Sequence, residues 1–179
     1  MGFKISWIGF HGTTKHQTLQ KAGLRDSGEI DEANEAPFSG AEIPSGWFIL
    51  FSNDFGFASP ERVASLSEDC LTVACQVHEG IMASGSCAFE RGTKLWQMEH
   101  GPQNRPSDLS VIGSPPATFR SIQDRLRQLQ AQQDNSQPLR LDYIFDIPVE
   151  TAESVCGYRH DRGRFEWGQP RFTRLEPIR

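Results

Sequence analysis

Three stretches of alternating apolar and polar residues follow one another between residues 71 and 100, and they constrain the fold more than any other feature. The stretches are residues 71–78, 82–89 and 94–100, and only short connections separate them. Alternation with a period of two is typical of a strand with one buried face. Short connections join antiparallel neighbours, whereas parallel strands need long crossovers. The sequence therefore predicts a three-stranded antiparallel meander.

Helix signals precede this meander. Thr14 followed by Gln17 is the pattern of a capping box, and Gly23 stands where a helix ends in a left-handed residue. Ser59 before Pro60 has the pattern of an N-cap followed by proline in the first turn. These signals predict two short helices, one over residues 14–22 and one beginning at residue 60.

The remaining elements complete an α+β pattern. Strands are predicted at residues 5–10, 47–52, 109–112 and 141–147, with Pro148 ending the last one before a helix over 149–156. The longest helix follows Pro115-Pro116, and we expect it to pack on the meander through Phe119, Ile122 and Leu126. We predict a single α+β domain spanning residues 1–179, with an antiparallel, meander-containing sheet and three to four helices.

Length and composition limit the class of protein. A chain of 179 residues suits one domain. It contains no apolar run near the ~20 residues that span a bilayer, and its first residues resemble a strand rather than a signal peptide. We therefore expect a cytoplasmic protein without a membrane partner. The four cysteines form no C-x-x-C pair, so free buried thiols are expected.

Residues 75–101 collect cysteine, histidine, methionine and glutamate side chains, which raises the question of a metal or catalytic site. Cys75 and His78 are three positions apart, so in a regular strand they point to opposite faces and cannot share one ion. We predict neither a metal nor another cofactor. An enzymatic alternative uses four residues that are expected to share a polar sheet face: His78, Ser84, Ser86 and Glu99.

Charge is distributed unevenly along the chain. Residues 26–61 contain eight acidic side chains and no lysine or arginine, whereas the whole chain has a net charge of −5. Residues 25–46 lack apolar periodicity and are rich in turn-forming residues, which predicts a long acidic surface loop. Such a loop would attract a basic protein and would disfavour direct contact with nucleic acid.

Some segments resemble an uncharacterised family of small bacterial cytoplasmic proteins. They are W-x-x-x-H-G at Trp7–Gly12, L-x-x-x-G-L at Leu19–Leu24, the segment Cys75–His100, and D-Y-I-F-D-I-P-V-E at Asp142–Glu150. In size, acidity and α+β layout the chain is similar to immunity proteins that neutralise secreted bacterial toxins. The resemblance implies a toxin as partner, and it assigns no functional residue.

Two hypotheses follow from these observations. The first is a non-enzymatic cytoplasmic binding protein, of the immunity type, that blocks a toxin through its acidic surface. Its predicted contacts combine carboxylates with aromatic anchors: Asp26, Glu29, Asp31, Glu32, Glu35, Phe38 and Phe55. The alternative is a small enzyme or ligand-binding domain that uses the polar face of the meander. A deep pocket at that face would favour the alternative.

Overall fold

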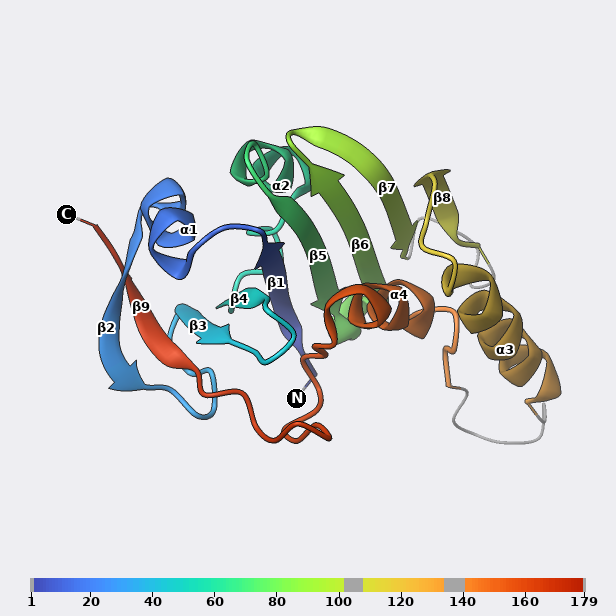
Figure 1. Ribbon diagram of the computed structural model, residues 1–179. Coiled ribbons are helices and arrows are strands. Elements are labelled where there is room, and N and C mark those ends of the chain that lie inside the picture. The colour runs from blue at the N-terminus through green and yellow to red at the C-terminus, as the bar shows by residue number, and fades with distance from the viewer. Residues whose placement is uncertain (1, 102–107, 134–140, 179) are drawn as a thin grey trace.

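A nine-stranded antiparallel sheet organises the chain, in the order β2-β9-β3-β4-β1-β5-β6-β7-β8 (Figure 1). The computed structural model describes residues 2–101, 108–133 and 141–178. Within these ranges the strands are β1 Lys4–His11, β2 Leu24–Ile30, β3 Phe38–Glu42, β4 Phe48–Ser52, β5 Leu71–His78, β6 Ala83–Glu90, β7 Thr93–His100, β8 Ser110–Gly113 and β9 Thr173–Pro177. The helices are α1 Lys15–Ala22, α2 Pro60–Leu66, α3 Phe119–Gln132 and α4 Asp146–Cys156, with a short 3-10 helix at Glu79–Ile81. The predicted α+β class is confirmed.

The meander is confirmed as β5-β6-β7, extended by β8. Cys75 pairs with Ser86, and Ser86 pairs with Met98, so these three residues lie side by side on one face. The alternation of β5 places Cys75 and His78 on opposite faces, as the sequence predicts.

Helices cover both faces of the sheet and create two apolar cores. Helices α1 and α2 cover one face, where Leu19 and Val63 pack with Ile8 and Leu50. Helix α4 covers the other face and packs its apolar residues against a cluster that includes Trp7. Both faces of the central strands are therefore buried from solvent, which explains the continuous apolar run of β4.

Local end signals account for α1 and α2. The Thr14 side chain accepts the backbone N–H of Gln17, and the Gln17 side chain accepts the backbone N–H of Thr14 at 3.2 Å, so the capping box is present. Gly23 has a φ of 69°, the left-handed conformation that glycine adopts without a steric penalty. Ser59 caps α2 ahead of Pro60.

Helix α3 departs from the expectation that it packs on the meander. It packs mainly against α4 and lies beside the sheet, near β8 (Figure 1). The Thr118 hydroxyl contacts the Ser154 hydroxyl at 2.8 Å, and Arg125 pairs with Glu150, so polar contacts join the two helices. Leu126 is buried, whereas Phe119 and Ile122 are only partly buried. The helix and its packing residues were predicted correctly, but its main partner is α4 and not the meander.

Replacing Leu126 with alanine is expected to lower the free energy of unfolding by about 2–5 kcal/mol, because the side chain is 2 % exposed and would leave a cavity. Replacing the half-buried Ile122 with alanine should lower it less. Denaturant unfolding of both variants measures the difference. An equal or larger loss at Ile122 would contradict the described packing of α3.

The predicted strand over residues 141–147 is wrong. The Asp142 carboxylate accepts the backbone N–H groups of Ile144 and Phe145, which closes a turn, and α4 begins at Asp146. Pro148 then stands in the first turn of the helix, where its missing N–H leaves no hydrogen bond unmade. Proline was interpreted as the end of a strand, and it belongs to the beginning of a helix.

The predicted long loop over residues 25–46 is also wrong. Strands β2 and β3 occupy much of it, and both pair with β9 from the C-terminal end of the chain. Ser39, Gly40 and Ala41 of β3 are buried. The acidic segment therefore belongs to the sheet, with only residues 31–37 connecting its two strands.

Candidate functional site

Ser84, His100 and Asp142 have the residue types of a hydrolytic triad and lie close together. Ser84 and His100 are partners on β6 and β7, and the His100 Nε2 atom is 2.9 Å from the Asp142 Oδ2 atom. The Ser84 hydroxyl, however, donates to the carbonyl oxygen of Phe145 at 2.7 Å. The His100 Nδ1 atom is 2.9 Å from the carbonyl oxygen of Asp108. No ring nitrogen is left to accept a serine proton, so the cluster fastens α4 to the sheet.

The charge state of His100 follows from its two partners. A carbonyl and a carboxylate both accept, so the two ring nitrogens are placed to donate together, which favours the positively charged imidazole. The hydrogen bond to Asp142 raises the pKa of His100 despite its burial. Burial acts to raise the pKa of Asp142, but the hydrogen bond and charge of His100, together with the backbone N–H groups of Phe145 and Ile144, lower it overall. The sequence analysis missed this pair because its members are 42 positions apart.

The four residues of the enzymatic alternative do not form one face. Ser84 and Ser86 lie beneath α4 on the face of Cys75 and Met98. His78 follows Val77 to the opposite face, and Glu99 pairs with Gly85 there. The expected shared polar face is therefore wrong, since strand alternation separates the serines from the histidine and glutamate.

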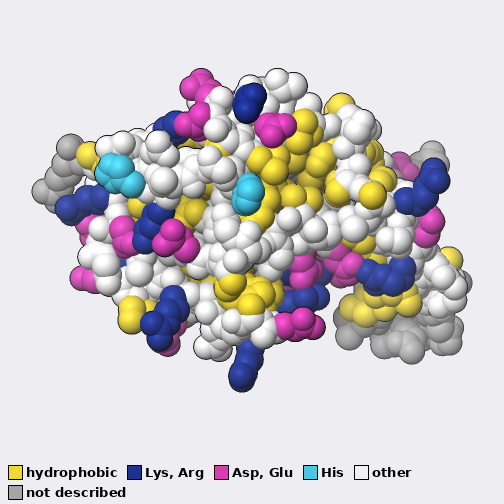
Figure 2. Space-filling model, in the orientation of Figure 1, with side chains coloured by type: hydrophobic (Ala, Val, Ile, Leu, Met, Phe, Trp, Pro, Cys, Tyr) yellow, Lys and Arg dark blue, Asp and Glu magenta, His cyan; other side chains and the backbone are white. Residues whose placement is uncertain are grey.

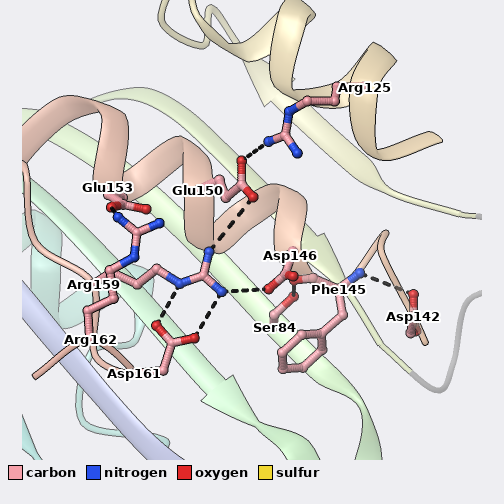
Figure 3. Close-up of polar contacts among 10 residues, drawn as sticks. All are labelled: Ser84, Arg125, Asp142, Phe145, Asp146, Glu150, Glu153, Arg159, Asp161 and Arg162. Atoms are coloured by element: carbon pink, nitrogen blue, oxygen red, sulfur yellow. Dashed lines mark hydrogen bonds and ion pairs between the residues drawn. The ribbon is translucent and has the colours of Figure 1, made fainter. Parts of the chain in front are cut away.

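Arg159 is the centre of a cluster of ion pairs around α4 (Figure 3). Its guanidinium donates to both carboxylate oxygens of Asp161, at 2.6 and 3.0 Å, and to Asp146 at 3.0 Å. Glu150 lies 3.8 Å away. Burial raises the pKa of Asp146 even beside Arg159. Burial also acts to raise the pKa of Asp161, but the bonds from Arg159 hold it below its usual range.

Two of the predicted partner-binding carboxylates have structural contacts instead. Asp26 pairs with Lys15 at 2.5 Å and accepts the backbone N–H of Gly28. Asp31 accepts the backbone N–H groups of Glu35 and Ala36 and the hydroxyl of Ser39. Asp26 therefore joins α1 to β2, and Asp31 holds the connection between β2 and β3 in place. The sequence analysis recognised neither role.

The other three carboxylates are exposed, and in the sequence they flank an exposed apolar residue. Glu29, Glu32 and Glu35 all reach solvent, and Ile30 at the end of β2 is 74 % exposed. We call these four residues the acidic edge surface. The Glu29 carboxylate has a long contact, 3.7 Å, with the Arg174 guanidinium. On the face shown in Figure 2 acidic and basic side chains are interspersed, so the acidic run does not make that face uniformly negative.

The two predicted aromatic anchors are not free. Phe38 is half-buried and packs its ring edge-on against Phe57, with centroids 4.9 Å apart. Phe55 is half-buried beside His78, with centroids 5.6 Å apart. Ile30, which the sequence analysis did not select, is the more accessible apolar group.

An open groove of about 1170 Å³ runs beside the acidic edge surface. One wall comes from the turn after β2, and the other from residues 160–173, between α4 and β9. Its polar lining includes three arginines, and we therefore call it the arginine groove: Arg162, Arg164, Arg171, His160, Asn34 and Glu32. The sequence analysis missed it because its walls are more than 120 positions apart in the chain.

The described residues give little support for a cysteine nucleophile or for a metal site. All four cysteines are free and buried, and burial raises the pKa of Cys70 to about 11 and that of Cys87 to about 12. Their thiolates are therefore scarce at neutral pH. No group of three or more metal-ligating side chains comes together in residues 2–101, 108–133 and 141–178.

Comparison of the chain with protein-family models, curated proteins and solved structures found no significant match. Within the part of the chain that the structure describes, no helix is long and apolar enough to cross a membrane. The acidic edge surface and the arginine groove are therefore the candidate functional sites of this protein.

Proposed function

We propose that this protein acts by binding a basic protein partner through the acidic edge surface. The observation that carries this proposal is the exposure of Ile30 between Glu29 and Glu32. A large aliphatic side chain that is 74 % exposed gains free energy when a partner covers it. Carboxylates around such a contact attract a basic partner during diffusion and reject an acidic one.

The position of this surface in the sheet supports the same proposal. Among the described strands β2 pairs only with β9, so its outer edge offers backbone groups to a second chain. An exposed edge strand is a recurrent docking element in protein complexes. Side-chain charge and backbone hydrogen bonds would then act on the same partner.

The resemblance to immunity proteins suggests the class of the partner. We propose that it is a secreted bacterial toxin with a basic active-site region, which the bound protein occludes. The role requires no catalytic group. Direct binding of nucleic acid is disfavoured at this surface, because the carboxylates would repel phosphates.

Converting Glu29, Glu32 and Glu35 together to glutamine tests the proposal. The association rate with a purified partner should fall about tenfold or more at low salt, because the steering charge is lost. Asp26 and Asp31 stay unchanged, since they hold the fold. Stopped-flow binding at several salt concentrations gives the rates, with a partner identified by co-purification from the native host.

A matched control removes the same charge elsewhere. Glu68, Glu90 and Glu99 are exposed and lie outside the acidic edge surface, so their conversion to glutamine should change the rate much less. Replacing Ile30 with serine should instead speed dissociation, because off-rates depend on apolar contacts. Equal effects of the two triple variants, or association that does not vary with salt, would refute a localised electrostatic docking surface.

A further inference from the structure

The arginine groove has an apolar base. Phe51, Tyr158 and Phe172 line it, and the centroid of the Phe172 ring is 5.8 Å from that of Tyr158 and 6.1 Å from that of Phe51. All three side chains are nearly fully buried in the core under the sheet face that carries α4. Phe3 lines the groove as well and is 39 % exposed, so it offers an accessible ring to a ligand. This base is held by the core and does not depend on a ligand for its shape.

Positive charge in the groove exceeds what the protein itself neutralises. Arg162 pairs with Glu153 at 2.5 Å, but Arg164 and Arg171 make no hydrogen bond or ion pair to any residue that the structure describes. Asp161 also lines the groove, and Arg159 occupies both of its carboxylate oxygens. Two guanidinium groups therefore face the groove with Glu32 as the remaining carboxylate.

Two polar atoms in the lining are buried without a partner. They are the Oδ1 atom of Asn34 and the Nδ1 atom of His160. Asn34 has a φ of 52°, a conformation that is uncommon for residues other than glycine. The His160 ring is held edge-on by Phe3, with centroids 4.9 Å apart. A buried polar atom that lacks a hydrogen bond is costly, so a ligand that supplied one would gain free energy at these two lining residues.

We propose that the arginine groove binds a small organic anion. Its phosphate or carboxylate group would pair with Arg164 and Arg171, whose planar guanidinium groups match such anions. Its apolar part would lie against Phe3, and a hydroxyl or N–H group would donate to the Asn34 side-chain oxygen. This proposal is independent of the protein-binding function, although Glu32 and Ile30 belong to both regions.

Calorimetric titration of the full chain with four probes tests this proposal: phenyl phosphate, benzoate, inorganic phosphate and neutral phenol. Saturable binding with a stoichiometry of one is expected for phenyl phosphate or benzoate, and the stronger of the two identifies the anionic group. Inorganic phosphate should bind more weakly because it lacks the apolar part, and phenol should not bind. Absence of saturable binding by both aromatic anions would overturn the proposal.

Paired variants separate a built site from general charge attraction. Converting Arg164 and Arg171 to glutamine should weaken binding of the preferred anion about tenfold or more, since each loses a charge-assisted hydrogen bond. Converting Arg120 and Arg174, which lie outside the groove, removes the same charge and should leave the affinity nearly unchanged. Equal weakening by both pairs would refute the site.

The two proposals respond in opposite directions to one variant. Converting Glu29, Glu32 and Glu35 to glutamine should slow association with a basic protein. The same change should not weaken anion binding, because it removes negative charge beside the groove. Failure of one proposal is therefore distinguishable from failure of the other.

Discussion

Replacing Arg159 with methionine is expected to lower the free energy of unfolding by about 3–5 kcal/mol, the largest polar effect that this structure implies. The Arg159 side chain is only 11 % exposed, and Asp146 and Asp161 both accept its hydrogen bonds (Figure 3). Methionine fills similar space but leaves these carboxylates without a counter-charge at the start and beyond the end of α4. Urea unfolding at pH 7 measures the change.

A compensating variant tests the cause of this loss. Adding Asp146→Asn and Asp161→Asn to Arg159→Met should recover a large part of the lost stability, because the uncompensated charges are removed. Arg162→Met is the control, since Arg162 is 53 % exposed and a surface ion pair contributes about 1 kcal/mol or less. A loss below about 1 kcal/mol in Arg159→Met itself would show that the cluster is not a structural centre.

Replacing Asp142 with asparagine is expected to lower the free energy of unfolding by about 2–3 kcal/mol near pH 6. His100 is 2 % exposed on its side chain and would lose the partner of its positive charge. The asparagine oxygen can still accept the N–H groups of Ile144 and Phe145, so the turn before α4 is kept. The variant therefore isolates the charge interaction from the turn.

The stability difference between wild type and Asp142→Asn should depend on pH. The pKa of His100 is raised above 6.5 in the folded state, so its contribution is complete below pH 6.5 and is lost as the pH rises through the folded pKa. The difference should accordingly shrink from pH 6 towards pH 8. Chemical denaturation at several pH values gives the curve, and a difference that grows with pH would contradict the charged His100.

His160 titrates in a lower pH range than His100 and therefore does not interfere with this measurement of stability against pH. Burial lowers the pKa of His160 to about 4, so its neutral form favours the folded state. Its contribution rises with pH between about 4 and 6.5 and is constant above that range. Measurements above pH 6 therefore report mainly on His100.

Several elements of this protein are encoded in short stretches of sequence. The capping box of Thr14 and Gln17 and the left-handed Gly23 define α1, because the groups that satisfy each helix end are three or four residues away. The meander follows from alternation within 71–100 and from short connections between its strands. The opposite placement of Cys75 and His78 needs only the period of a strand.

Other features of this protein depend on residues far apart in the sequence, and the tertiary structure determined them. Strand β2 forms because β9, more than 130 positions along the chain, supplies its hydrogen bonds. Strand β3 pairs with the nearby β4 and also with β9, so the acidic segment becomes part of the sheet. Residues 141–147 contain a helix start rather than a strand, since His100 holds Asp142 where it can cap the turn. The acidic residues of 26–35 likewise divide into structural and exposed ones according to the contacts that the fold brings to them.

The candidate sites show this division most clearly. Composition alone indicated an excess of acid over residues 26–61, and Glu29, Glu32 and Glu35 remain exposed as predicted surface residues. The arginine groove exists only because the turn at Asn34 and the segment around Arg164 meet across the sheet. Capping and strand alternation act between near neighbours and can be inferred from a single sequence. Strand pairing and groove formation join residues far apart in the chain, so only the folded structure brings them together.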